Sequence, residues 1–186
     1  MLRDSALIPS EAVRLAALGI LAERPRRYGE LAGEIRHFVS RLVGPSLDLM
    51  GSSLELLRHE GLIERSGGDA AGYTTPETEI RITPAGLREF EALLTAPLRG
   101  PIHDLGKLVI ALKLRFLHRL PQPGQMAQIE MLIEIYEGEV ARLRDLKSRV
   151  GANSGNLAPW LDHEIAQAEE RLAWFRALGG RIGRAP

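Results

Sequence analysis

The sequence lacks cysteine altogether, and its formal net charge is zero. Without cysteine, neither a disulfide framework nor a thiolate metal site is possible. A balanced charge argues against strong non-specific attraction to nucleic acids or to membranes. No apolar run is long enough to cross a bilayer, and the first residues do not have the pattern of a signal peptide. We therefore expect a cytoplasmic protein with no membrane partner.

Motifs that carry catalysis are missing as well. The 186 residues contain no Gly-x-Ser-x-Gly sequence, no phosphate-binding loop and no plausible pair of catalytic acids. The glycine-rich run 67–72 falls in an expected hairpin loop, so it is not a dinucleotide fingerprint. Five histidines are present without metal-ligand spacing: His37, His59, His103, His118 and His163. The sequence predicts a protein that is not an enzyme and that needs no cofactor or metal.

Charge is unevenly divided between the two halves of the chain. Residues 1–92 carry 11 basic and 14 acidic side chains, a net charge of −3, whereas residues 93–186 carry 13 and 10, a net charge of +3. If the first half binds DNA, it does so without a favourable overall charge.

The first 96 residues have the element order of a winged helix-turn-helix domain. Apolar spacing predicts helices from Ser10 to about residue 23, over 28–43, and from Ser46 to Gly61, where a left-handed residue is favoured. Alternating residues predict strands at 62–65 and 79–83, joined by a Gly- and Ser-rich loop. Thr83-Pro84 then has the pattern of a helix start. The fold class is therefore mainly α, with three helices and a β-hairpin wing.

The remaining residues, 97–186, predict a C-terminal helical dimerisation domain. A Pro- and Gly-rich stretch at 96–101 marks the boundary. One helix is expected over 101–120, a second ends at about residue 147, and a third ends at about residue 178. A frayed tail is expected from Gly179. The two long helices would form an antiparallel hairpin. Its apolar stripes either pack on the winged helix of the same chain or pair with a second copy, and two-fold pairing is the commonest solution. The dimerisation candidates are Leu112, Phe116, Ile133, Tyr136, Val140, Trp160, Leu172 and Phe175.

The run from Ala12 to Gly86 resembles the PadR family of bacterial transcriptional regulators. The matching motifs are Leu18-Gly19-Ile20-Leu21-Ala22-Glu23, Tyr28-Gly29-Glu30-Leu31, Leu54-Glu55-Leu56-Leu57-Arg58-His59-Glu60-Gly61-Leu62-Ile63-Glu64 and Ile82-Thr83-Pro84-Ala85-Gly86. The helices from Pro101 onward are similar to the arm of the larger members, which are related to virulence-gene activators. The resemblance implies a homodimer whose recognition helices enter adjacent major grooves of a double-stranded operator. It also implies repression more often than activation, and a small-molecule effector in many members.

Nine residues are candidates for DNA contact: Arg27, Tyr28, Ser46, Asp48, Leu49, Ser52, Ser53, Arg65 and Arg81. Ser46 and Asp48 either cap the third helix or contact DNA, and one residue can do both. Arg27 and Tyr28, at the start of the second helix, are either exposed to solvent or within reach of the DNA backbone. Arg65 and Arg81 either clamp phosphates or pair with Glu64 and Glu79.

Two departures from the family pattern suggest an alternative function. Gly51-Ser52 stands where the family has a Tyr-Pro pair, and the expected wing is acidic between its two arginines. The alternative is a winged-helix protein-interaction module, or a ligand sensor, with weak or lost DNA binding.

Overall fold

A computed structural model describes residues 9–43, 50–67, 74–98, 104–150 and 155–184. The chain divides into two compact units, of which the first contains the elements up to Arg119 and the second contains the last two helices. The elements of the first unit are α1 (Pro9–Glu23), β1 (Arg26–Arg27), α2 (Tyr28–Val43), α3 (Met50–His59), β2 (Ile63–Arg65), β3 (Glu79–Ile82), α4 (Pro84–Thr95), α5 (Asp104–Phe116) and the 3-10 turn η1 (Leu117–Arg119). Those of the second are α6 (Gln122–Arg149) and α7 (Leu157–Ile182).

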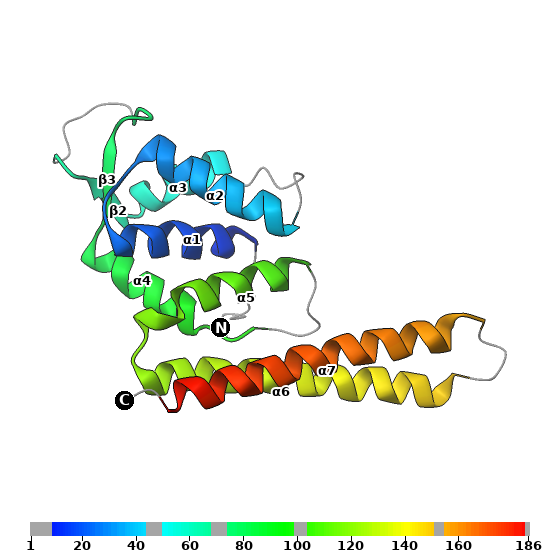
Figure 1. The fold of residues 1–186 in the computed structure, drawn as a ribbon. Coiled ribbons are helices and arrows are strands. Elements are labelled where there is room, and N and C mark those ends of the chain that lie inside the picture. Colours follow the sequence, from blue (N-terminus) through cyan, green and yellow to red (C-terminus); the bar gives the residue numbers. More distant parts are fainter. Residues whose placement is uncertain (1–8, 44–49, 68–73, 99–103, 151–154, 185–186) are drawn as a thin grey trace, which may run out of the picture. The chain divides into compact units, whose positions relative to one another are not determined.

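Helix α1 forms the centre of the first unit (Figure 1). Its side chains are apolar on nearly all sides, and Leu15, Leu18 and Ile20 are at most 1% exposed. A helix that is hydrophobic all round must be covered all round. Here α2, α3, α4, α5 and β3 all pack against it. The predicted winged helix-turn-helix is confirmed, because three helices are followed by the β2–β3 hairpin and α4.

The sheet contains one strand that the sequence did not predict. Its order is β1-β3-β2 with antiparallel pairs, so β3 is the central strand. β1 is only two residues long and pairs Arg26 with Ile80 and Arg27 with Glu79. So short a strand has no alternation of its own, and it forms because β3 lies beside it. It holds the start of α2 against the base of the wing.

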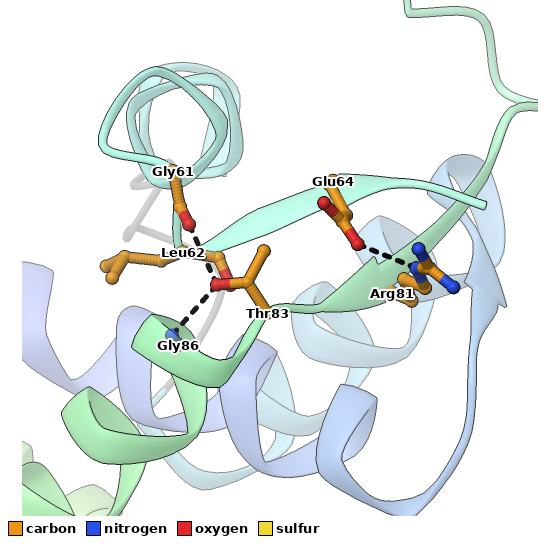
Figure 2. A network of polar contacts seen from close by, with 6 residues as sticks. All are labelled: Gly61, Leu62, Glu64, Arg81, Thr83 and Gly86. Carbon is orange, nitrogen blue, oxygen red and sulfur yellow. Dashed lines mark hydrogen bonds and ion pairs between the residues drawn. The ribbon is translucent and has the colours of Figure 1, made fainter. Parts of the chain in front are cut away.

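The helix ending at Gly61 and the helix cap at Thr83 fix the junction between α3, the wing and α4, and Figure 2 shows the bonds of Thr83. Gly61 has a φ of 71°, and the amides of Gly61 and Leu62 donate to the carbonyls of Arg58 and Leu57, which is the Schellman ending of a helix. The predicted cap at Thr83 is confirmed, since its hydroxyl accepts from the Gly86 amide at 3.0 Å. This arrangement locks α3 to the wing.

The same Thr83 hydroxyl also binds the end of α3 from the other side. It donates to the carbonyl of Gly61 at 2.8 Å and lies 3.1 Å from that of Leu62 (Figure 2). A Cβ atom at Gly86 would lie 2.1 Å from the Leu62 carbonyl oxygen, so only glycine fits there. The Thr-Pro-Ala-Gly motif is therefore a packing requirement of this junction.

Helix α5 packs with the first unit, although the sequence placed the boundary at residues 96–97. It contacts α1 and α2, and the ring of Phe116 fits against Gly19, where a Cβ atom would lie 2.4 Å from the ring. Phe116 also meets Phe90 edge to face, with ring centroids 5.7 Å apart. On α5 the buried Lys113 donates to the carbonyl of Ala96 at 2.7 Å, which closes the end of α4. These contacts are long-range, so the local Pro- and Gly-rich pattern did not reveal them.

Helices α6 and α7 lie side by side and antiparallel, as the sequence predicted for the arm (Figure 1). Tyr136 stacks on Phe175 between them, with ring centroids 5.3 Å apart. Helix α7 continues through Gly179 to Ile182, so the expected frayed tail is wrong for these residues. The reason is packing: a Cβ atom at Gly179 would lie only 3.3 Å from Ile129, and glycine lets the helices approach closely.

Candidate nucleic-acid interface

Among the described residues of α3, Leu56 and His59 on the outer side are exposed. Leu54 and Leu57 are buried at 1% and 0% exposure, whereas Leu56 between them is 51% exposed. The inner face packs on α1. The end of α3 is held by Arg14 of α1, whose guanidinium lies 2.6 Å from the carboxylate of Glu60. A rigidly docked helix with a free outer face is the arrangement that a recognition helix requires.

The expected contact residues on the third helix are only partly placed. Ser46, Asp48 and Leu49 lie outside the described residues, so their roles as caps or contacts stay predictions. Ser52 and Ser53 belong to α3, and their side chains are also outside the description.

The start of α2 is covered by the chain that leads into β3. The amide of Tyr28 donates to the carbonyl of Thr78 at 2.9 Å, and the amide of Gly29 donates to that of Pro76 at 2.8 Å. A Cβ atom at Gly29 would lie 3.0 Å from Pro76, which accounts for a glycine near the helix start. Two of the four amides that a helix start offers to an anion are therefore already bonded.

Tyr28 joins α2 to α3 through its side chain. Its hydroxyl is hydrogen-bonded to Glu55, and burial, together with that carboxylate, raises the pKa of the Tyr28 hydroxyl. Glu55 also accepts from Arg58 Nε at 3.1 Å. Glu55 was not singled out from the sequence. An acidic residue on the outer side of the expected third helix could have indicated that it pairs with a neighbouring side chain.

The wing arginines differ in their surroundings. Arg81 stands opposite Glu64 in the β2–β3 register, and its Nε donates to the Glu64 carboxylate at 2.8 Å (Figure 2). The interpretation that Arg81 pairs on the sheet is thus confirmed for Glu64. Arg65 is opposite Ile80 and is half-buried. Glu79 stands opposite Arg27 of β1.

Three arginines near this surface are each paired with an acid of the same unit. Besides Arg81 and Arg58, Arg26 lies 3.9 Å from the carboxylate of Glu23. Arg27 is exposed, and within the residues that the structure covers it has no ion pair. Arg27 is therefore the candidate whose charge is most available to a phosphate.

The dimerisation candidates separate into two groups. Leu112 and Phe116 are fully buried in the core of the first unit, so a partner could reach them only if α5 left its place. The others lie on α6 and α7: Tyr136, Val140, Leu172 and Phe175 are at most 7% exposed, Ile133 is intermediate, and Trp160 is 52% exposed. The buried members form the seam between α6 and α7 of a single hairpin.

The two sides of the hairpin carry different chemistry. Arg176 binds Glu137 at 2.7 Å, and Arg144 with Glu169 and Lys147 with Asp162 make further ion pairs across the helices. These three ion pairs form a ladder along the hairpin. On α7, Trp160 lies two residues before Asp162 and Trp174 lies two residues before Arg176, so each tryptophan is about 200° around the helix from the ladder. Trp160 and Trp174 are 14 residues apart, close to four turns, so both project on the side away from the ladder. They are 52% and 47% exposed.

Two further properties bear on the class of protein. Among the described residues, no three of His, Asp or Glu lie together so as to hold a metal ion. None of the helices described combines the length and the apolar character needed to cross a membrane.

Comparison with solved structures gives matches to the PadR protein of Bacillus subtilis. The complex with p-coumaric acid is 15% identical over 97% of this chain and 100% of that chain, with a TM-score of 0.37. A crystal structure of PadR is 14% identical over the same shares, with a TM-score of 0.39. The complex with operator DNA is 15% identical over 91% of this chain and 98% of that one, with a TM-score of 0.36.

Sequence comparison identifies the family. No protein of curated function matches the chain. The family described as "Putative AphA-like transcriptional regulator" matches residues 2–179. That match spans nearly the whole chain and confirms the regulator family that the motifs indicated. The chain therefore belongs to the AphA-like transcriptional regulators.

Proposed function

We propose that this regulator is a homodimer that binds double-stranded DNA and represses transcription in the bacterial cytoplasm. One observation carries the proposal: α3 is packed on its inner side and exposes Leu56 on its outer side, next to a hairpin wing, in a chain of a regulator family. A helix so presented can enter the major groove while the wing lies on the flanking backbone.

Phosphate contact in the proposed complex rests on few charges. Arg27 of β1, directly before α2, supplies an exposed cation, and Arg65 and Arg81 stand on the wing. Because Arg81 is bound to Glu64, its charge is partly neutralised before DNA arrives. We therefore propose binding that is modest in affinity and sensitive to salt.

The second part of the proposal assigns dimerisation to the α6–α7 arm. Trp160 and Trp174 expose large aromatic surfaces on one side of α7, and aromatic residues are enriched in interface cores. A two-fold pairing of this side buries both tryptophans of each chain in one contact. In this proposal α5 belongs to the DNA-binding unit and not to the dimerisation domain.

Selection from sheared genomic DNA tests the DNA-binding half. The full chain is immobilised at low salt, and the retained fragments are sequenced. The proposal expects enrichment of defined fragments that are lost as salt is raised, because the released counterions then oppose binding. Retention of no DNA, together with capture of a protein through the wing, would support the interaction-module alternative instead.

Sedimentation of the full chain tests the dimer. The wild type is expected at twice the monomer mass of 20.5 kDa at micromolar concentration. The double variant Trp160→Ser, Trp174→Ser should sediment as a monomer, whereas Arg144→Ser on the opposite side of the hairpin should remain a dimer. A wild-type monomer at all concentrations contradicts this half of the proposal and leaves the DNA half standing.

A small-molecule effector stays a prediction from the family resemblance. A thermal-shift screen with aromatic acids tests it, and a flat response across the screen would count against it.

A further inference from the structure

We propose that Leu56 of α3 is a specificity-determining residue that reads the C5-methyl group of thymine in the major groove. The inference rests on the proposed DNA-binding function and adds the chemistry of its target. A leucine side chain makes no hydrogen bond, so in the major groove the base feature it recognises best is the thymine methyl.

The position of Leu56 supports this role. Leu54 and Leu57 point into the core, and Leu56 is turned away from both by the helical period. It is half exposed, and it is one of only a few large apolar side chains in the described part of the first unit that are so exposed. Contact with a methyl group would remove that apolar surface from water, and this burial favours binding.

Three polar side chains near Leu56, those of Arg58, Glu55 and Tyr28, interact with one another. Arg58 Nε donates to the carboxylate of Glu55 at 3.1 Å, and the hydroxyl of Tyr28 is bonded to the same carboxylate. Arginine is the usual reader of guanine, and here one edge of the Arg58 guanidinium is bonded to Glu55 of the same helix. The described outer side of α3 therefore offers an apolar contact beside a self-paired polar cluster.

This arrangement predicts how the protein chooses its site. Discrimination should come from where thymine methyls lie in the half-site, and less from hydrogen bonds by Arg58. Deoxyuridine pairs as thymine does and lacks only the methyl group, so it removes the proposed contact and leaves base pairing unchanged.

The test uses the full chain and a duplex obtained by the genomic selection. Each thymine is replaced in turn by deoxyuridine, and affinity is measured by fluorescence anisotropy. The wild type should lose about fourfold in affinity at one thymine or more per half-site, the factor expected for one buried methyl-sized group. Leu56→Ala should bind the thymine duplex more weakly by a similar factor and be indifferent to deoxyuridine at those positions.

A matched control is Leu87→Ala, which changes another exposed leucine, 39% exposed, on α4. Helix α4 packs on α1, and this variant should leave both affinity and the deoxyuridine effect unchanged. The inference is overturned if the wild type tolerates deoxyuridine at every position, or if Leu56→Ala keeps the full sensitivity. If no duplex is retained at all, the proposed function fails, and this inference fails with it.

Discussion

Arg81 and Glu64 face each other across the β2–β3 hairpin, with Arg81 Nε 2.8 Å from a carboxylate oxygen. Both side chains are about half exposed, so the pair adds little to the stability of the sheet. Its effect is on the charge of the wing, because a guanidinium held by a carboxylate is less available to a phosphate. The excess of acidic side chains in residues 1–92 therefore reduces the positive charge that the wing offers at the proposed interface.

Removal of that carboxylate should strengthen DNA binding. In Glu64→Gln the Arg81 guanidinium loses its counter-charge, so affinity should rise several-fold and the slope of log K against log salt should steepen by about 0.9, the value for one added phosphate contact. Fluorescence anisotropy over a salt series measures both. Glu139→Gln makes the same charge change in the arm and should leave the slope as in the wild type. An unchanged slope for Glu64→Gln would show that the wing arginine does not meet a phosphate.

Loss of the exposed Arg27 of β1 should have the opposite effect. Arg27→Ala is expected to weaken binding to all duplexes alike and to reduce the salt slope by about 0.9. Because Arg27 is exposed, the free energy of unfolding should change by less than about 0.5 kcal/mol. Arg88→Ala on α4 serves as the control with the same charge. Equal losses in both variants would indicate a general charge effect and not a contact by Arg27.

The contact of Gly19 with Phe116 predicts a specific packing defect. A Cβ atom at Gly19 would lie 2.4 Å from the Phe116 ring, so Gly19→Ala should lower the free energy of unfolding by about 1–3 kcal/mol. A Cβ atom at Gly33 of α2 would have no neighbour within 4 Å, so Gly33→Ala should raise it by about 0.5–1 kcal/mol. Denaturant unfolding compares the two. A stabilising Gly19→Ala would mean that α5 is not held against α1.

The buried Lys113 predicts a pH dependence of stability. Burial lowers the pKa of its ammonium from 10.5 to about 8. Below pH 8 both the folded and the unfolded chain hold this proton, and between pH 8 and 10.5 the unfolded chain holds more of it. Stability should therefore rise with pH in this window, relative to Lys113→Met, which cannot titrate.

The measurement is the free energy of unfolding of the two proteins from about pH 7 to 10.5, taken as a difference so that other groups cancel. A difference between the wild type and Lys113→Met that stays level over this range would show that burial does not lower the pKa of Lys113.

Local patterns predicted those parts of the fold whose causes are local. Helix α2 has the predicted bounds, Gly61 adopts the left-handed ending, and Thr83 caps α4. Each depends on residues within a few positions of one another, so the sequence displays the cause directly.

The features that the sequence did not predict have causes far apart in the chain. β1 exists because β3 lies beside it, and α5 joins the first unit because Phe116 fits against Gly19. At the proposed interface, the pairing of Arg81 with Glu64 was one of two alternatives, and the covering of α2 by Pro76 was not foreseen. Gly29 indicates that another segment packs closely against the start of α2, but a glycine alone does not show that this segment contains Pro76.

We expect the outer side of α3, the wing and Arg27 of β1 to bind DNA together. The most direct test is the salt dependence of binding between the full chain and a duplex retained in the genomic selection, measured for the wild type and for Arg27→Ala. We predict a linear fall of log K with log salt, with a shallower slope for the variant. Binding that is absent at low salt and micromolar protein, or slopes that are identical, would contradict it.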